Sequence, residues 1–149
     1  MCEQVGEQMM TMALNNLERD GYVAFATLLL SPEGELTPLL LETVSDESKD
    51  KLAVMLRALA PHLSAIVVIS EAWTLEDSAA INALGPNNRV ADSPQRKEGV
   101  FVQVASQQGD LLLTTGFTRD PNNGAPIRPT EIKKAWQRGV VGRFQGLFA

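Results

Sequence analysis

Hydrophobic residues recur at helical spacing in the first segment of the chain. The positions i, i+4, i+8 and i+12 of one stripe are held by Val5, Met9, Ala13 and Leu17. Such a stripe predicts an amphipathic helix over residues 3–19, with its apolar side against a core. Gly21 marks the end of this helix, because glycine accepts the left-handed conformation of a helix cap at little cost.

A second helical stripe follows Ser45, which we expect to be an N-cap. Acidic residues come next, in the first turn, where the helix dipole favours anions. The apolar positions of the stripe are Leu52, Met55, Leu56, Leu59 and Leu63. Pro61 lacks the amide hydrogen that a helix interior needs, so the regular helix is predicted to end near Ala60.

Alternating or continuous apolar runs predict five β-strands between and after these helices. They cover residues 22–30, 36–42, 65–71, 99–106 and 111–117. The turn sequences SPEG and QQGD join the first two and the last two of these strands into hairpins. The unbroken AIVVI of the third strand indicates burial on both faces, and therefore a central place in the sheet.

The remaining segments are less regular. Residues 74–98 are the least regular part, in which residues 76–84 could form a short helix and the polar segment from there to residue 98 reads as a long loop. Residues 118–129 read as an exposed loop. Thr130 can cap a last helix that runs to about Arg138. Residues 139–149 form an apolar tail, which we expect to dock either on the body of the protein or on another subunit.

The resulting order is α-β-β-α-β-(loop)-β-β-α in a single α+β domain over residues 1–149. We expect a mixed sheet of about five strands, made of two hairpins and a central strand and covered by helices. A right-handed crossover would place the strand after the middle helix parallel to a hairpin strand. This order resembles the cytidine-deaminase-like fold and the JAB-type metalloprotease fold, both of which mount zinc on a layered sheet.

The metal ligands that those two folds need are missing from the chain. It has one histidine, His62, and one cysteine, Cys2, so no zinc site is expected. The GxSxG, SxxK and phosphate-binding glycine patterns are also missing. We therefore expect no metal and no cofactor, with a carboxylate-only Mg or Ca site, for example from Asp110 and Asp120, as the open alternative.

The chain is acidic, with a formal net charge of -5 over 149 residues. An acidic surface repels phosphate backbones, so nucleic-acid binding would need a local basic patch on the last predicted helix, with Lys133, Lys134 and Arg138. No apolar run approaches the roughly 20 residues that span a bilayer, and the first ten residues lack the basic residues of a secretory signal. With one cysteine, the simplest expectation is a cytoplasmic protein of bacterial type, without a membrane partner.

The third predicted strand runs into a carboxylate and an indole, Glu71 and Trp73. At the edge of a sheet, partial desolvation can raise the pKa of such a carboxylate, which suits an acid or a base. The alternative is structural. In that case Glu71 forms an ion pair, with Arg96 as the preferred partner and Arg89 as the second, while Trp73 covers the core like a lid.

The stretch Ser70-Glu71-Ala72-Trp73, followed by Pro94-x-Arg96-x-Glu98 and a valine-rich strand, resembles a group of bacterial proteins with no known activity. The resemblance covers about residues 47–115. It implies no reaction, but it groups Glu71, Trp73, Arg96 and Glu98 as one cluster. We take this cluster as the candidate ligand-binding site.

Two classes of function follow from these features. The first is a binding or assembly module that associates with itself through edge strands, the methionine-rich first helix and the apolar tail. The second is an enzyme or small-ligand binder, with Glu71 as acid or base, Arg96 as an anion clamp and Trp73 as a stacking wall. Because no recognisable catalytic set is present, the binding or assembly module is the preferred prediction.

Overall fold

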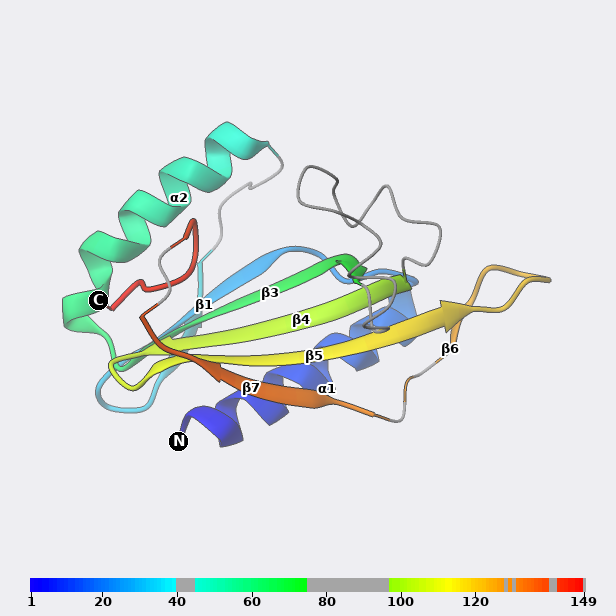
Figure 1. Cartoon of the computed structure of the whole chain (residues 1–149), viewed down its shortest axis with the longest axis horizontal. Helices are drawn as coiled ribbons and strands as arrows, with labels where there is room; N and C mark the ends of the chain where they lie inside the picture. Colours follow the sequence, from blue (N-terminus) through cyan, green and yellow to red (C-terminus); the bar gives the residue numbers. More distant parts are fainter. Residues whose placement is uncertain (40–44, 75–96, 128, 130, 140–141, 149) are drawn as a thin grey trace.

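The computed structural model describes residues 1–39, 45–74, 97–127, 129, 131–139 and 142–148. Two helices and one sheet make up most of this part of the chain (Figure 1). In chain order the elements are α1 (Cys2–Asp20), β1 (Ala26–Leu30), β2 (Leu36–Pro38), α2 (Asp46–Leu59), the short 3-10 helix η1 (Ala60–His62), β3 (Ala65–Thr74), β4 (Lys97–Ser106), β5 (Gly109–Arg119), β6 (Pro126–Ile127) and β7 (Lys133–Gln137).

The strands form one curled sheet in which every described pair is antiparallel. Its order is β2-β1-β3-β4-β5-β6, and β7 also pairs with β5. The α+β class and the central position of β3 are thus confirmed, whereas the expected parallel crossover is wrong. The chain leaves α2 beside the end of β1, where the Ser64 N–H donates to the Leu30 carbonyl at 2.9 Å. From that point β3 can only run back along β1.

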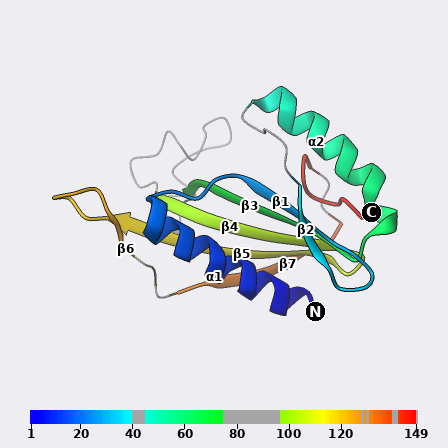
Figure 2. The same ribbon diagram turned by 180° about the vertical axis from the view of Figure 1, so that it is seen from behind.

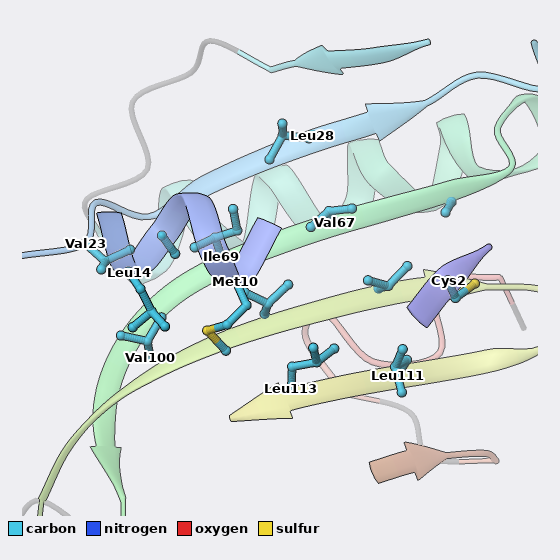
Figure 3. Close-up of a cluster of buried hydrophobic side chains, with 14 of the residues drawn as sticks. Cys2, Met10, Leu14, Val23, Leu28, Val67, Ile69, Val100, Leu111 and Leu113 are labelled. Carbon is cyan, nitrogen blue, oxygen red and sulfur yellow. The ribbon is translucent and has the colours of Figure 1, made fainter. Parts of the chain in front are cut away.

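Helix α1 lies across one face of the sheet, as the view from behind shows (Figure 2). Figure 3 shows Met10 and Leu14 pointing from α1 onto the sheet, toward Ile69 and Val100. The approach is close at Gly6, where an added Cβ would lie 2.7 Å from Cδ1 of a leucine on β5.

The predicted cap of α1 is confirmed. Gly21 has a φ of 83°, in the left-handed region that glycine occupies readily. Its N–H donates to the Leu17 carbonyl at 2.8 Å, so the helix ends where the sequence places its end.

Helix α2 packs on the opposite face, because Ile66 and Val68 alternate along β3 with the residues that face α1. The predicted N-cap is confirmed, since the Ser45 hydroxyl accepts the Ser48 N–H at 3.1 Å in a capping box. The helix ends at Leu59, and the proline that follows lies in η1. Neither described helix is long and apolar enough to span a membrane.

The predicted last helix, over residues 130–138, is wrong. Lys133–Gln137 form strand β7, which pairs with residues 110–114 of β5. This pairing, and the contact of Trp136 with the core on the α1 side, outweigh the local capping signal. Successive residues of a strand point to opposite faces, so Lys133 and Lys134 do not form the basic helix face that the nucleic-acid alternative requires.

Residues 118–129, predicted as an exposed loop, contain more regular structure than expected. Strand β5 continues to Arg119, and Thr118 and Arg119 pair with β6. The exposed turn is therefore limited to residues 120–125, where Asp120 Oδ1 accepts the Asn122 N–H at 2.8 Å. This extension of β5 brings an arginine to the end of the sheet.

The described tail, residues 142–148, packs on the body beside α2. Leu147 is only 3% exposed, and Phe144 and Phe148 contact the same hydrophobic cluster. The Arg57 side chain donates to the carbonyls of Gly142, Arg143 and Gln145. A single guanidinium on α2 therefore binds three backbone carbonyls within four consecutive residues of the tail.

Replacement of Leu147 by alanine tests whether the tail belongs to the cooperative fold. We expect the free energy of unfolding in urea to fall by about 2–5 kcal/mol, because a buried leucine is replaced by a cavity. The matched control is Ile132→Ala, since Ile132 is 41% exposed and its loss should change stability little. Equal effects of the two substitutions would show that the tail packs only weakly.

Candidate functional site

Three of the four residues predicted as a cluster lie at one end of the sheet. Trp73 on β3 is directly opposite Glu98 on β4, and Glu98 is opposite Phe117 on β5. Glu71 lies two residues before Trp73, on the face that α1 covers. The expected proximity of these residues therefore follows from the strand register. Arg96 lies outside the described residues, as does Arg89.

The partner of Glu71 in the structure is an arginine that the sequence analysis did not consider. Arg119 Nη2 lies 3.7 Å from Glu71 Oε1, and Arg119 Nε donates to Glu98 Oε2 at 2.8 Å. The guanidinium also lies 5.3 Å from the centre of the Phe117 ring. Two carboxylates thus share one cation at a half-buried place. The only sequence signal for Arg119 is its even spacing from Phe117 along β5.

The second oxygen of Glu71 is occupied as well. Oε2 accepts the backbone N–H of Val23 at 3.0 Å. Val23 belongs to the link between α1 and β1 and is itself buried in the core (Figure 3). Glu71 therefore ties this link to the end of β3, and each of its oxygens has a partner within the protein.

The electrostatics of the cluster favour the charged form of Arg119. The hydrogen bond to Glu98 is the main cause that raises the pKa of Arg119 above its ordinary value, and the charges of Glu98 and Glu71 act in the same direction against partial burial. Such a network stabilises structure as readily as it serves chemistry. Trp73, which the structural alternative expects to cover the core, is 44% exposed.

A groove lies on the other face of the sheet, between β3, β4, α2 and the tail. Its volume is about 500 Å³, within the range of small-molecule sites. The aromatic residues that line it are Phe25, Phe101 and Phe144. Ser70 and Gln103 contribute polar atoms at its floor, because they alternate along β3 and β4 with residues that face α1.

Two cations, Lys49 and Arg143, also line this groove. Arg143 is neutralised by Asp50 at 2.9 Å and by Asp46 at 3.3 Å. Lys49 Nζ instead lies 5.4 Å from the centre of the Phe25 ring. Among the described residues, no carboxylate lies within ion-pair distance of Lys49, so its charge is available to a ligand.

In the part of the chain that the structure describes, no three histidine, cysteine, aspartate or glutamate side chains are grouped so that they could hold a metal ion. Asp110 and Asp120, considered above as a carboxylate pair, lie at opposite ends of β5. Comparison of the chain with protein-family models, with curated proteins and with solved structures found no match.

Replacement of Arg119 by methionine should expose the structural role of the cluster. It leaves Glu71 and Glu98 as two neighbouring, uncompensated carboxylates, so we expect the free energy of unfolding at neutral pH to fall by about 1–3 kcal/mol.

Both variants are compared by urea unfolding at neutral pH, and the matched control is Arg19→Met. Arg19 forms an ion pair with Asp20 at 2.9 Å, but both side chains are exposed, so its loss should leave stability unchanged. If the two variants behave alike, Arg119 does not hold this end of the sheet together.

Proposed function

We propose that the protein is a binding module and that the groove between the sheet, α2 and the tail is its binding site. The ligand that suits this groove is an amphipathic molecule with an aromatic or other flat apolar body and one anionic group. The observation that carries the proposal is the presence of three phenylalanine walls beside Lys49, a cation with no carboxylate partner among the described residues.

The apolar part of this argument rests on the walls of the groove. Phe25 and Phe144 lie with ring centres 5.7 Å apart, at an interplanar angle of 41°. Phe101 contributes a third ring from β4. Flat apolar groups gain from contact with aromatic faces and edges in addition to the area that they bury, so these walls favour a planar ligand.

The charged part rests on which groups face the groove. Lys49 and Arg143 line it, whereas the two aspartates that neutralise Arg143 do not. Glu71 contributes to the groove through β3, but its carboxylate is held by Val23 and Arg119. The side-chain charges directed to a ligand are therefore positive, although the whole chain is acidic.

The cluster of Glu71, Trp73 and Glu98 supports an enzyme less well than the groove supports binding. Acid–base catalysis needs a group within hydrogen-bond reach of the substrate. Both oxygens of Glu71 already have protein partners, and Glu98 is engaged by Arg119. A group whose partners are all internal has little left to offer to a ligand.

Two fluorescent probes of similar shape test the proposal. Anilinonaphthalene sulfonate is flat and anionic, and N-phenylnaphthylamine is its neutral counterpart. We expect saturable binding of the anionic probe that Lys49→Gln weakens by about threefold to tenfold, because one partly exposed charge is lost. The affinity of the neutral probe should not change in this variant.

The matched control is Lys51→Gln on the same helix, because Lys51 pairs with Glu47 at 3.3 Å and does not line the groove. Ser70→Trp should block both probes by filling the floor of the groove. Probe binding that survives Ser70→Trp would contradict the location, and equal effects of the two lysine variants would contradict the role of Lys49. Probe affinity that falls as protein concentration rises would indicate that a second copy of the chain covers the groove.

A further inference from the structure

A second recess lies beneath the β4–β5 hairpin, at a place that the proposed function does not use. Its volume is about 230 Å³. The segments that line it are the hairpin, the end of β7 and the tail, with Gln107, Gln108, Asp110, Gln137, Arg138 and Gly146 among them. Asp110 is the acidic residue of this lining.

Asp110 is 4% exposed, which is rare for an aspartate without a cationic partner. Its Oδ2 accepts the Gly146 N–H at 2.9 Å. Among the described residues, no cation lies within ion-pair distance of its carboxylate, and no other hydrogen-bond donor reaches it. An ionised carboxylate can accept about four hydrogen bonds, so Asp110, which lines the recess, has acceptor capacity left for a ligand.

The energetic state of Asp110 agrees with this geometry. Burial raises the pKa of Asp110 above its ordinary value, and the Gly146 hydrogen bond acts in the opposite direction but does not cancel it. A buried charge is normally paired or hydrogen-bonded. The charged form of this carboxylate is therefore under-compensated by the described residues, and a cationic ligand would supply the missing positive charge.

Arg138 also lines the recess, but its guanidinium does not form an ion pair with Asp110. Its Nε donates to the Gln108 carbonyl at 2.9 Å, and its guanidinium lies 4.9 Å from the centre of the Trp136 ring. The backbone at Gly109 supports this arrangement, because a Cβ there would lie 2.8 Å from Arg138 Cγ and 2.9 Å from the Gln137 carbonyl oxygen. The hairpin thus packs against Arg138 without bringing it to Asp110.

We propose that this recess binds a primary ammonium group, with Asp110 as its anchor. A guanidinium fits less well, because its fork needs both carboxylate oxygens and Gly146 occupies one. A divalent metal fits less well still, because it takes six or more oxygen ligands and the recess offers one carboxylate. An ammonium group needs only one strong acceptor, and the side-chain amides of Gln107 and Gln108 at the rim can accept its other hydrogens.

The test is a titration of the whole chain with methylammonium chloride, followed through the amide NMR signals of Gly109 and Gly146. We expect saturable shifts at these two signals in the wild type and affinity at least about tenfold weaker in Asp110→Asn, because hydrogen bonds to a charged acceptor are the stronger ones. The matched control is Asp120→Asn at the far end of β5, which should bind as the wild type does.

Tetramethylammonium chloride at the same concentration controls for charge, because it is a cation without N–H donors. Equal shifts with this salt would overturn the proposal, as would the absence of saturable shifts with methylammonium or full affinity in Asp110→Asn. A parallel titration with Nα-acetyl-lysine amide separates two sources of the ammonium group. Binding of the lysine derivative in preference to methylammonium would indicate a lysine of a partner protein, and the reverse would indicate a free amine.

Asp110→Asn should be as stable as the wild type. A loss of methylammonium binding in this variant would therefore report the loss of the carboxylate and not a failure to fold. Because the folded protein binds the Asp110 proton more tightly than the unfolded chain does, the contribution of Asp110 to stability falls as the pH rises above the ordinary aspartate range. Asparagine is neutral and escapes this penalty at pH 7, while its side-chain oxygen can still accept the Gly146 N–H. In the wild type, saturating methylammonium should in turn lower the pKa of the Asp110 carboxyl, as measured by carbon NMR.

Discussion

The antiparallel pairing of β3 with β4, and of β4 with β5, determines where every candidate group lies. Nine consecutive residue pairs join β3 to β4, from Ile66 with Ala105 to Thr74 with Lys97. Alternation along this register sends Glu71 and Glu98 to the α1 face and Ser70 and Gln103 to the groove. A shift by one residue would exchange the two sets, so the ion-pair cluster and the groove exist only in this register.

The local features of the fold could be predicted from the sequence, because their causes lie close together along the chain. The left-handed cap at Gly21, the N-cap at Ser45 and the tight β4–β5 turn each depend on a few adjacent residues. The same holds for the central place of β3, since its unbroken apolar run requires cover on both faces.

Features that depend on distant pairing could not be predicted in the same way. Strand β7 follows a threonine and a glutamate that locally favour a helix start, and only the edge offered by β5 makes it a strand. The partner of Glu71 was missed for a related reason. Arg119 reaches it across β4, from the far end of a strand that continues beyond its apolar residues, and no spacing in the sequence reports that approach.

The polar groups of this protein differ in whether their charges are balanced internally. Around Arg119, one guanidinium and two carboxylates contact one another, and Glu71 also accepts a backbone N–H. Lys49 and Asp110 differ from this cluster. Lys49 lines the groove and Asp110 lines the recess, and neither has an oppositely charged partner among the described residues. A charged side chain that lines open space without an internal partner is therefore a better candidate for ligand binding than one that is paired within the protein.

The described tail forms a wall of both the groove and the recess of Asp110. Phe144 and Gln145 line the groove, and Gly146 and Phe148 line the recess of Asp110. These residues follow all the described strands along the chain, and they are held in place by Arg57 of α2. A ligand in the groove or in the recess of Asp110 would therefore contact the docked tail, and its binding would favour the docked form over any form in which the tail is detached.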